Sequence, residues 1–251
     1  MNEQLHALEA SAARLRNIVE GLRPEQLTMQ AYPSQWTIAD VLSHVGSGAV
    51  IMLGGLNAQV TGVPLADGYH QSVWDEWNSK QPADQATGAL AADRALLDRA
   101  AGLTDEQRAA FHFTLGPMEL DVTKFLGMRL NEHSLHTWDI EVALDPSATL
   151  PSQSTDLVVD SLEIVGRFGA KPDGQERAVS VHTTEPDRDF TITSSAEAVS
   201  LTPSTTAADP DLALPAEAFV RLVYGRLDQA HTPPGVEGPE LASLRSIFPG
   251  F

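Results

Sequence analysis

Residues 129–140 read RLNEHSLHTWDI, and they lie at the centre of the most regular helical pattern in the chain. Apolar side chains recur at helical spacing on both sides of them, which predicts a helix from about Leu120 to Leu144. Glu132 and His136 are four residues apart, so both side chains leave the same face of that helix, about one turn apart. This spacing suits two ligands of a single ion.

The face that carries this pair is polar where a helix in a bundle normally presents leucines. Its members are Phe125, Arg129, Glu132, His136, Asp139 and Ala143. Burying such groups costs free energy unless they are paired or bound to a metal, so an interior cavity is expected along the stripe. Asp139 and Arg129 would then support the ligating side chains, or form a structural ion pair or rim charges.

A third ligand should come from a facing helix. Thr37 and Asp40 form a capping-box pair, which predicts a second helix that continues to about Asn57. His44 lies about two turns into that helix among apolar residues, where an ordinary core has no need of an imidazole. His44 is therefore the best candidate.

Three nitrogen and oxygen ligands leave one coordination position open, as in catalytic zinc sites. Zinc is the expected ion, and nickel, manganese or iron could occupy the same ligands. Each ligand also has an ordinary explanation. A Glu–His pair at this spacing is often solvated, and a lone histidine in a core is often satisfied by hydrogen bonds. Trp36 and Trp138 suit a core or a cavity wall.

Composition narrows the function. The 251 residues include no cysteine, so any thiol used in catalysis must come from a small molecule. The formal charge of −18 opposes binding to nucleic acid and to anionic lipid. The N-terminal stretch does not resemble a signal peptide, and no apolar run has the length of a membrane-spanning helix. A cytoplasmic location is therefore expected.

The rest of the pattern predicts an α+β protein, with a helical bundle over residues 1–170 and a small α+β domain over residues 171–251. Further helices are expected at 5–22, at 83–101 with Leu90, Leu96 and Leu97 inward, at 157–168 and at 215–228. Strands are expected at 178–184, 189–193 and 196–202. Residues 61–78, 111–120 and the tail from His231 are expected to be irregular.

Two motifs, QWTIADVLSHVGS at 35–47 and RLNEHSLHTWDIEVAL at 129–144, resemble the mycothiol-dependent maleylpyruvate isomerase family. That family belongs to the DinB-like superfamily of metal-binding four-helix bundles. The resemblance implies that His44, Glu132 and His136 bind the metal. It also implies that a low-molecular-weight thiol, mycothiol in actinobacteria, binds through its sulfur at the open position.

In that family an arginine of the C-terminal domain assists the reaction, which indicates Arg226, with Arg221 as the alternative. We accordingly predict Arg226 and Asp139 as catalytic residues, and Arg129 and Trp138 as contacts of the cofactor. The expected activity is that of a thiol-dependent isomerase or S-transferase acting on a small electrophile. A metal-dependent hydrolase and a non-catalytic stress or carrier protein remain alternatives. The expected assembly is a monomer or homodimer.

Overall fold

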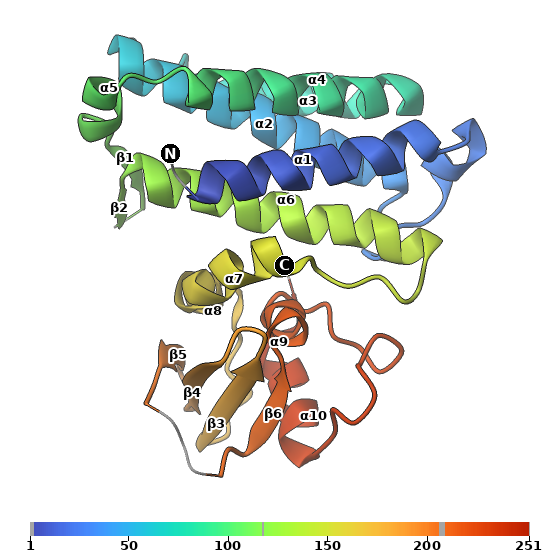
Figure 1. The fold of residues 1–251 in the computed structure, drawn as a ribbon, viewed down its shortest axis with the longest axis vertical. Coiled ribbons are helices and arrows are strands. Elements are labelled where there is room, and N and C mark those ends of the chain that lie inside the picture. The colour runs from blue at the N-terminus through green and yellow to red at the C-terminus, as the bar shows by residue number, and fades with distance from the viewer. Residues whose placement is uncertain (1–2, 117, 206–208, 251) are drawn as a thin grey trace. The chain divides into compact units, whose positions relative to one another are not determined.

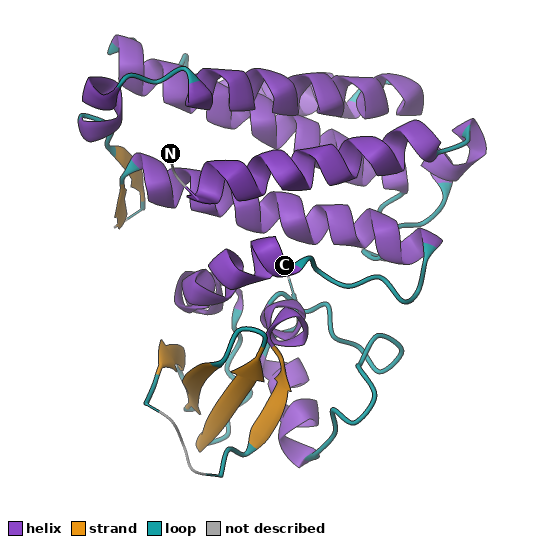
Figure 2. Cartoon of the chain, in the orientation of Figure 1, coloured by secondary structure: helices purple, strands orange, loops and turns teal. Residues whose placement is uncertain are grey.

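The computed structural model describes residues 3–116, 118–205 and 209–250. Its internal contacts divide it into two compact units, Met1–Ala148 and Thr149–Phe251. The first unit is mainly helical and the second contains a mixed four-stranded sheet, which confirms the predicted α+β class (Figure 2). Residues 149–170, which the sequence pattern assigned to the bundle, fall in the second unit.

Four long helices form the first unit (Figure 1). They are α1 (Glu3–Gly21), α2 (Ile38–Thr61), α4 (Pro82–Ala101) and α6 (Val122–Leu144). α2 packs against α4 and α6, while α1 packs against α6 and α4. The four helices therefore enclose one core, and α2 and α6 are neighbours in the bundle.

The start of α2 is set by the capping box that the sequence predicts. The backbone N–H of Asp40 donates to Thr37 Oγ1 at 3.2 Å, and the N–H of Thr37 donates to Asp40 Oδ2 at 2.9 Å. The helix ends at Gly62, whose φ of 72° lies in the left-handed region that glycine adopts at helix ends. α2 is long and apolar enough to cross a membrane, but 56% of its most apolar window is buried inside the protein.

Several short elements occupy segments that the sequence pattern left irregular. The helix α3 (Tyr69–Asn78) lies within residues 61–78, and only Val73 and Trp77 are buried along it. These two anchors are too few to produce a helical pattern. The helix α5 (Asp105–Ala109) precedes two short strands, β1 (Phe113–Leu115) and β2 (Met118–Leu120). Pro117, between these strands, is outside the described residues. A 3₁₀ turn, η1 (Pro24–Thr28), precedes α2.

Two glycines allow α3 to dock. A Cβ atom added at Gly46 of α2 would lie 2.1 Å from the ring of Trp77, and one added at Gly88 of α4 would lie 3.1 Å from it. The Trp77 ring therefore occupies space that a side chain at Gly46 would need. This contact holds α3 against α2 close to His44, which lies two residues before Gly46.

The buried face of α4 differs from the prediction. Leu96 is buried, whereas Leu90 and Leu97 are only half-buried. Most of the buried face consists of small or polar side chains, namely Gln85, Ala86, Ala89, Ala92, Asp93, Leu96 and Ala100. The leucine pattern misplaced this face because its buried positions are mostly alanines, with the charged Asp93 among them.

The second unit contains the sheet β5–β4–β3–β6. The three predicted strands are present as β3 (Arg177–Thr184), β4 (Arg188–Ser194) and β5 (Val199–Pro203), and β4 runs antiparallel to both of the others. The strand β6 (Leu212–Pro215), which the sequence did not reveal, pairs in parallel with β3. The predicted helix at 157–168 is interrupted, forming α7 (Ser152–Val158), η2 (Val159–Ser161) and α8 (Leu162–Gly169). α9 (Ala216–Val223) is shorter than predicted, and α10 (Pro239–Ile247) lies in the tail expected to be irregular.

Candidate metal centre

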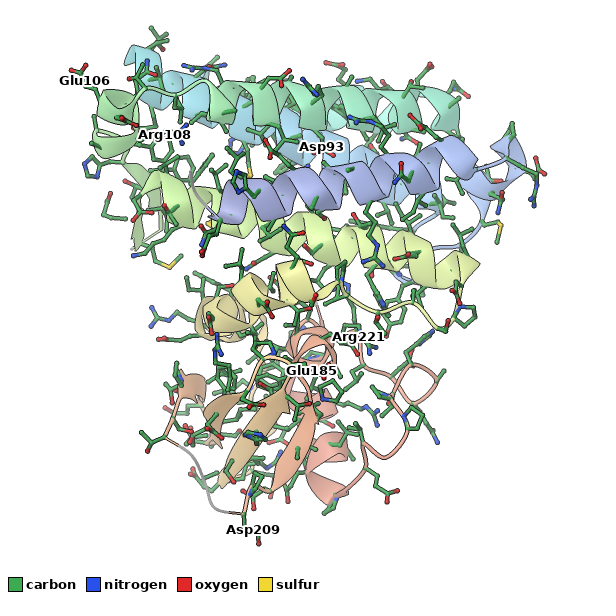
Figure 3. The ribbon with its side chains drawn as sticks, viewed as in Figure 1. Asp93, Glu106, Arg108, Glu185, Asp209 and Arg221 are labelled. Atoms are coloured by element: carbon green, nitrogen blue, oxygen red, sulfur yellow. The ribbon has the colours of Figure 1, made fainter. Side chains whose placement is uncertain are left out.

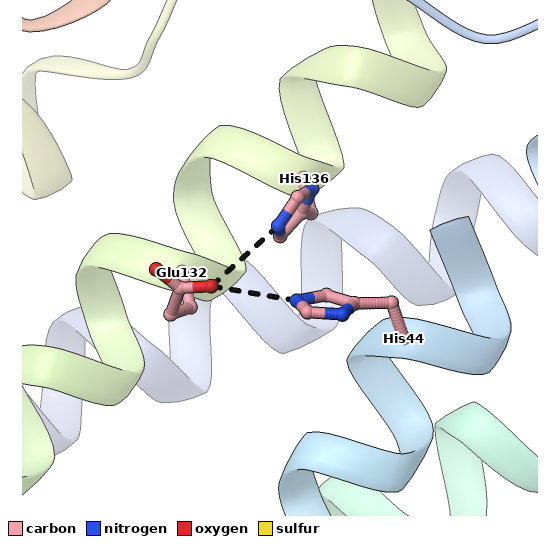
Figure 4. Close-up of side chains that lie close together, drawn as sticks. All are labelled: His44, Glu132 and His136. Carbon is pink, nitrogen blue, oxygen red and sulfur yellow. Dashed lines mark hydrogen bonds and ion pairs between the residues drawn. The ribbon is translucent and has the colours of Figure 1, made fainter. Parts of the chain in front are cut away.

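His44, Glu132 and His136 come together in the first unit. His44 extends from α2, and Glu132 and His136 extend from successive turns of α6 (Figure 4). Each side chain offers one ligand atom, and the three atoms lie within 4.8 Å of one another. The helices α2 and α6 thus bring together three donor atoms of the kinds that zinc binds.

The distances among the donors suit a shared ion better than hydrogen bonds. Glu132 Oε2 lies 3.4 Å from His44 Nε2 and 3.5 Å from His136 Nε2. Both separations exceed the roughly 2.9–3.0 Å typical of N–H···O hydrogen bonds. Two donors bound at about 2.1 Å to a tetrahedral ion would lie about 3.4 Å apart. The separations of Glu132 from His44 and from His136 therefore fit a shared divalent metal.

The centre is open on one side. The side chains of His44 and Glu132 are 41% and 49% exposed, whereas that of His136 is 11% exposed. Partial desolvation of the carboxylate raises the pKa of Glu132, but its interactions with the imidazoles of His136 and His44 lower it more. The net result is a pKa well below the ordinary glutamate value. Glu132 is accordingly a carboxylate throughout the neutral range.

Asp139 orients the most buried ligand. Its side chain is fully buried, and Oδ2 lies 2.8 Å from His136 Nδ1. A carboxylate at Nδ1 fixes the ring and its tautomer, so that Nε2 is directed to the metal position. The backbone also holds this residue in place, because the N–H of Tyr32 donates to the carbonyl oxygen of Asp139 at 3.0 Å.

Replacing Asp139 by asparagine should lower zinc affinity by about 10–100-fold, the usual cost of losing an outer partner of a metal ligand. The amide would still fill the space but would no longer offer a charged acceptor to His136. Competitive titration with a chromogenic chelator would measure the change. The exposed Asp105 offers a matched Asp105→Asn control, and an equal effect of both substitutions would contradict the positioning role.

A cavity of about 350 Å³ adjoins the centre. It is lined by Gln35, Trp36, Asp40, His44, Ser47, Trp74 and Asn78. The Trp36 ring lies 5.2 Å from the His44 ring and 5.9 Å from the His136 ring, measured between centroids. Of the lining residues, only His44 was singled out as functional from the sequence, and Trp36 was expected in a core or cavity wall. α3, which contributes Trp74 and Asn78, was not predicted.

The two residues predicted to contact the cofactor have other partners in the structure. Arg129 is buried, and its Nη2 donates to Asp93 Oδ1 at 2.6 Å and to the Val45 carbonyl at 2.9 Å. Trp138 is also buried, with Nε1 donating to the Ala148 carbonyl at 2.8 Å and its ring 4.9 Å from that of Tyr32. Contact with a cofactor stays a prediction for both.

Asp93 of α4, labelled in Figure 3, links Arg129 to a histidine. Asp93 Oδ2 lies 2.9 Å from His133 Nε2, and His133 Nδ1 lies 2.8 Å from Ser11 Oγ. The buried network of Ser11, Asp93, Arg129 and His133 therefore ties α1 and α4 to the helix that carries two of the candidate ligands. Neither Asp93 nor Ser11 stands in a sequence motif that would have marked it.

This network should make the free energy of unfolding fall at acid pH. Burial raises the pKa of Asp93, but the charges and hydrogen bonds of His133 and Arg129 lower it by more, so that the net pKa is about 2. Because the folded pKa lies below the ordinary value, the contribution is complete above about pH 4 and is lost as the pH falls toward 2. It should amount to about 2–3 kcal/mol. Urea unfolding of the wild type and Asp93→Asn between pH 2 and pH 5 would measure it, with the two curves converging at the acid end.

The predicted catalytic arginine and its alternative lie in the second unit. Arg221 is buried, pairs with Glu217 at 2.8 Å and donates to the His231 carbonyl at 2.8 Å. Arg226 donates through Nη1 to the Tyr224 carbonyl at 2.9 Å. The role of Arg226, with Arg221 as the alternative, stays a prediction.

The chain was also compared with known proteins and solved structures. The chain aligns with a crystal structure of a mycothiol-dependent maleylpyruvate isomerase with a TM-score of 0.67 at 12% identity, over 95% of this chain and 94% of that one. A histidine-to-alanine mutant of the enzyme gives the same values. No curated protein sequence matches significantly. The family model described as the mycothiol maleylpyruvate isomerase N-terminal domain matches residues 8–141. This match spans more than half of the chain and includes all three candidate ligands, and the chain therefore belongs to that family.

Proposed function

We propose that this protein is a metal-dependent enzyme that uses a low-molecular-weight thiol, mycothiol, as the nucleophile toward a small electrophilic substrate. The observation that carries the proposal is the convergence of His44, Glu132 and His136 within 4.8 Å at an open site. A chain without cysteine supplies no thiol of its own. Membership of the family and its structural likeness to a mycothiol-dependent enzyme support a borrowed thiol.

The three ligands have distinct tasks. Glu132 supplies the one anionic donor, because a glutamate side chain is ionised at neutral pH. His136 keeps its proton on Nδ1 toward Asp139, which leaves Nε2 free to bind. His44 supplies the third ligand from α2, and its ring lies beside that of Trp36. A divalent ion such as zinc, when held by these donors, favours the deprotonated form of a bound thiol near neutral pH.

The reaction is either S-transfer, in which the thiol stays attached to the product, or cis-trans isomerisation, in which it adds and is then expelled. In both, carbon–sulfur bond formation places negative charge on the electrophile or its leaving group. Arg226 is proposed to stabilise that charge, with Arg221 as the alternative. We also propose a cytoplasmic location, where a reduced thiol is maintained.

The test combines metal analysis with thiol binding. Metal content of the purified protein is measured first, and the same sample is then titrated calorimetrically with mycothiol before and after chelation. We expect close to one zinc per chain, with thiol binding that disappears on chelation and returns on adding zinc. Metal without thiol binding would contradict the thiol step and favour a metal-dependent hydrolase or a carrier protein. Protein that binds no ion at pH 7 would contradict the metal centre.

A further inference from the structure

Arg129 has a buried guanidinium between the two helices that carry the candidate ligands. We propose that Arg129, held by Asp93, is a positioning residue that sets the separation of His44 on α2 from Glu132 and His136 on α6. Its effect on a bound ion rests on the proposed function, because it concerns the same metal centre. The role requires no contact between Arg129 and the cofactor.

The guanidinium lies in the layer of side chains next to the ligands. Arg129 and Glu132 are three residues apart on α6, so they share a face of that helix. His44 and Gly48 are four residues apart on α2 and likewise share a face. A Cβ atom added at Gly48 would lie 3.1 Å from Arg129 Nη1. The guanidinium therefore reaches α2 at the turn after His44, in space that a glycine leaves free.

The contact with α2 is made to its backbone, at the residue after His44. Arg129 Nη2 donates to the Val45 carbonyl at 2.9 Å. In an α-helix that carbonyl normally accepts from the N–H four residues later, so the guanidinium is an additional donor from another helix. A backbone carbonyl moves only with its helix, and this bond therefore fixes α2 against α6 beside His44. Asp139 positions His136 through its ring, whereas Arg129 positions His44 through the backbone.

Asp93 of α4 holds the guanidinium in this place. The Nη2 atom that contacts Val45 lies 2.6 Å from Asp93 Oδ1, and Asp93 Oδ2 lies 2.9 Å from His133 Nε2. Arg129 and His133 are one turn apart on α6, so a single carboxylate holds two successive turns of that helix. Neither charge can leave the pair without exposing the other as an unpaired buried charge, which makes the arrangement rigid.

The affinity of a metal site depends on such a separation. Zinc binds nitrogen and oxygen ligands at about 2.0–2.2 Å, and a constellation of ligands must be held to within about 0.5 Å to bind well. The three ligands come from two helices, so a small shift of α2 along or away from α6 displaces His44 from the other two. The loss of Arg129 should therefore weaken metal binding although Arg129 is not a ligand.

The test separates position from stability by means of the double variant Asp93→Leu with Arg129→Met. This variant removes both buried charges together, so the fold should keep most of its stability, but no side chain donates to the Val45 carbonyl. Competitive chelator titration of the full-length protein should show zinc binding at least about tenfold weaker than in the wild type. The visible spectrum of Co²⁺ bound in place of zinc should change, because it reports coordination geometry. Arg94→Ala, next to Asp93 but exposed, should behave as the wild type.

A second variant tests the same contact without removing a charge. In Gly48→Ala the new methyl group meets Arg129 Nη1 and pushes the guanidinium away from α2. It should weaken zinc binding in the same direction as the double variant, by a smaller factor. The matched control is Gly127→Ala on α6, where the nearest atom to an added Cβ is 3.9 Å away. Equal zinc affinities of the two alanine variants would count against the positioning role.

A readout without metal distinguishes this proposal from the proposed function. The rings of His44 and His136 lie 4.5 Å apart between centroids, so their protons should give a nuclear Overhauser contact in chelator-treated wild type and in Arg94→Ala. The contact should weaken in the double variant and in Gly48→Ala. The proposal is overturned if both variants, folded by circular dichroism, keep the wild-type contact. A wild type that binds no zinc would contradict the proposed function, while the Overhauser comparison would still decide the positioning role.

Discussion

His136→Ala should reduce zinc affinity by more than about 100-fold, beyond the 10–100-fold range for loss of an outer partner. His136 is the ligand that the protein holds most firmly, because its side chain is 11% exposed and its Nδ1 is fixed by Asp139. The alanine variant would retain only His44 and Glu132, one donor from each helix. Equilibrium dialysis against buffered zinc would measure the change.

The matched control is His112→Ala, because His112 is exposed and is not one of the three clustered donors. It should leave zinc binding as in the wild type. If His136→Ala bound zinc with the affinity of the control, the ion would have to be held elsewhere and the proposed centre would be wrong. Far-ultraviolet circular dichroism of both variants would show whether the bundle remains folded.

Arg129→Ala should lower the free energy of unfolding by about 3–5 kcal/mol, as is usual when one partner of a buried ion pair is removed. The pair of Arg129 Nη2 and Asp93 Oδ1 is 2.6 Å long, and both side chains are almost fully buried. Without the guanidinium, Asp93 retains the contact of Oδ2 with His133 Nε2, and the Val45 carbonyl loses a donor. Urea denaturation would measure the loss.

Arg94 provides the comparison, since it follows Asp93 on α4 but forms an exposed pair with Asp98. Arg94→Ala should leave the unfolding midpoint essentially unchanged because exposed pairs contribute little. The double variant Asp93→Leu with Arg129→Met should regain much of the stability lost in Arg129→Ala, because it removes both buried charges together. If the double variant is less stable than Arg129→Ala, the two charged side chains stabilise the fold by more than neutralising each other.

Local rules in the sequence predicted the long helices well. Thr37 and Asp40 fix the start of α2 through contacts within one turn. The apolar residues of α6 recur at helical spacing, a pattern that can be recognised from that segment alone. α3 was missed because it is held by one large side chain, Trp77, inserted at Gly46. That contact joins residues far apart along the chain, so no pattern within a short window could reveal it.

The candidate ligands followed the same logic. Glu132 and His136 share a face by helical geometry, and His44 stood out as an imidazole among the apolar residues of the second helix; the resemblance of two motifs then implied the same three ligands. Arg129 shows where such reasoning stops. Its place in the polar stripe left a cofactor contact and a structural ion pair open, and the structure shows an ion pair with Asp93, 36 residues earlier, a partner that the sequence did not indicate. A long flexible side chain can leave the face that its Cα occupies, so its partner depends on the tertiary fold.

The division of the ligands between two helices has a mechanical consequence. His44 and Glu132 are 88 residues apart in the chain, and a shared ion would fasten α2 to α6 across that interval. A protein with no cysteine would thus possess a reversible counterpart of a disulfide, closing a long loop without a covalent bond. The free energy of unfolding would then rise with the free ion concentration, by about 2.7 kcal/mol when that concentration is 100 times the dissociation constant. The melting temperature would rise with it.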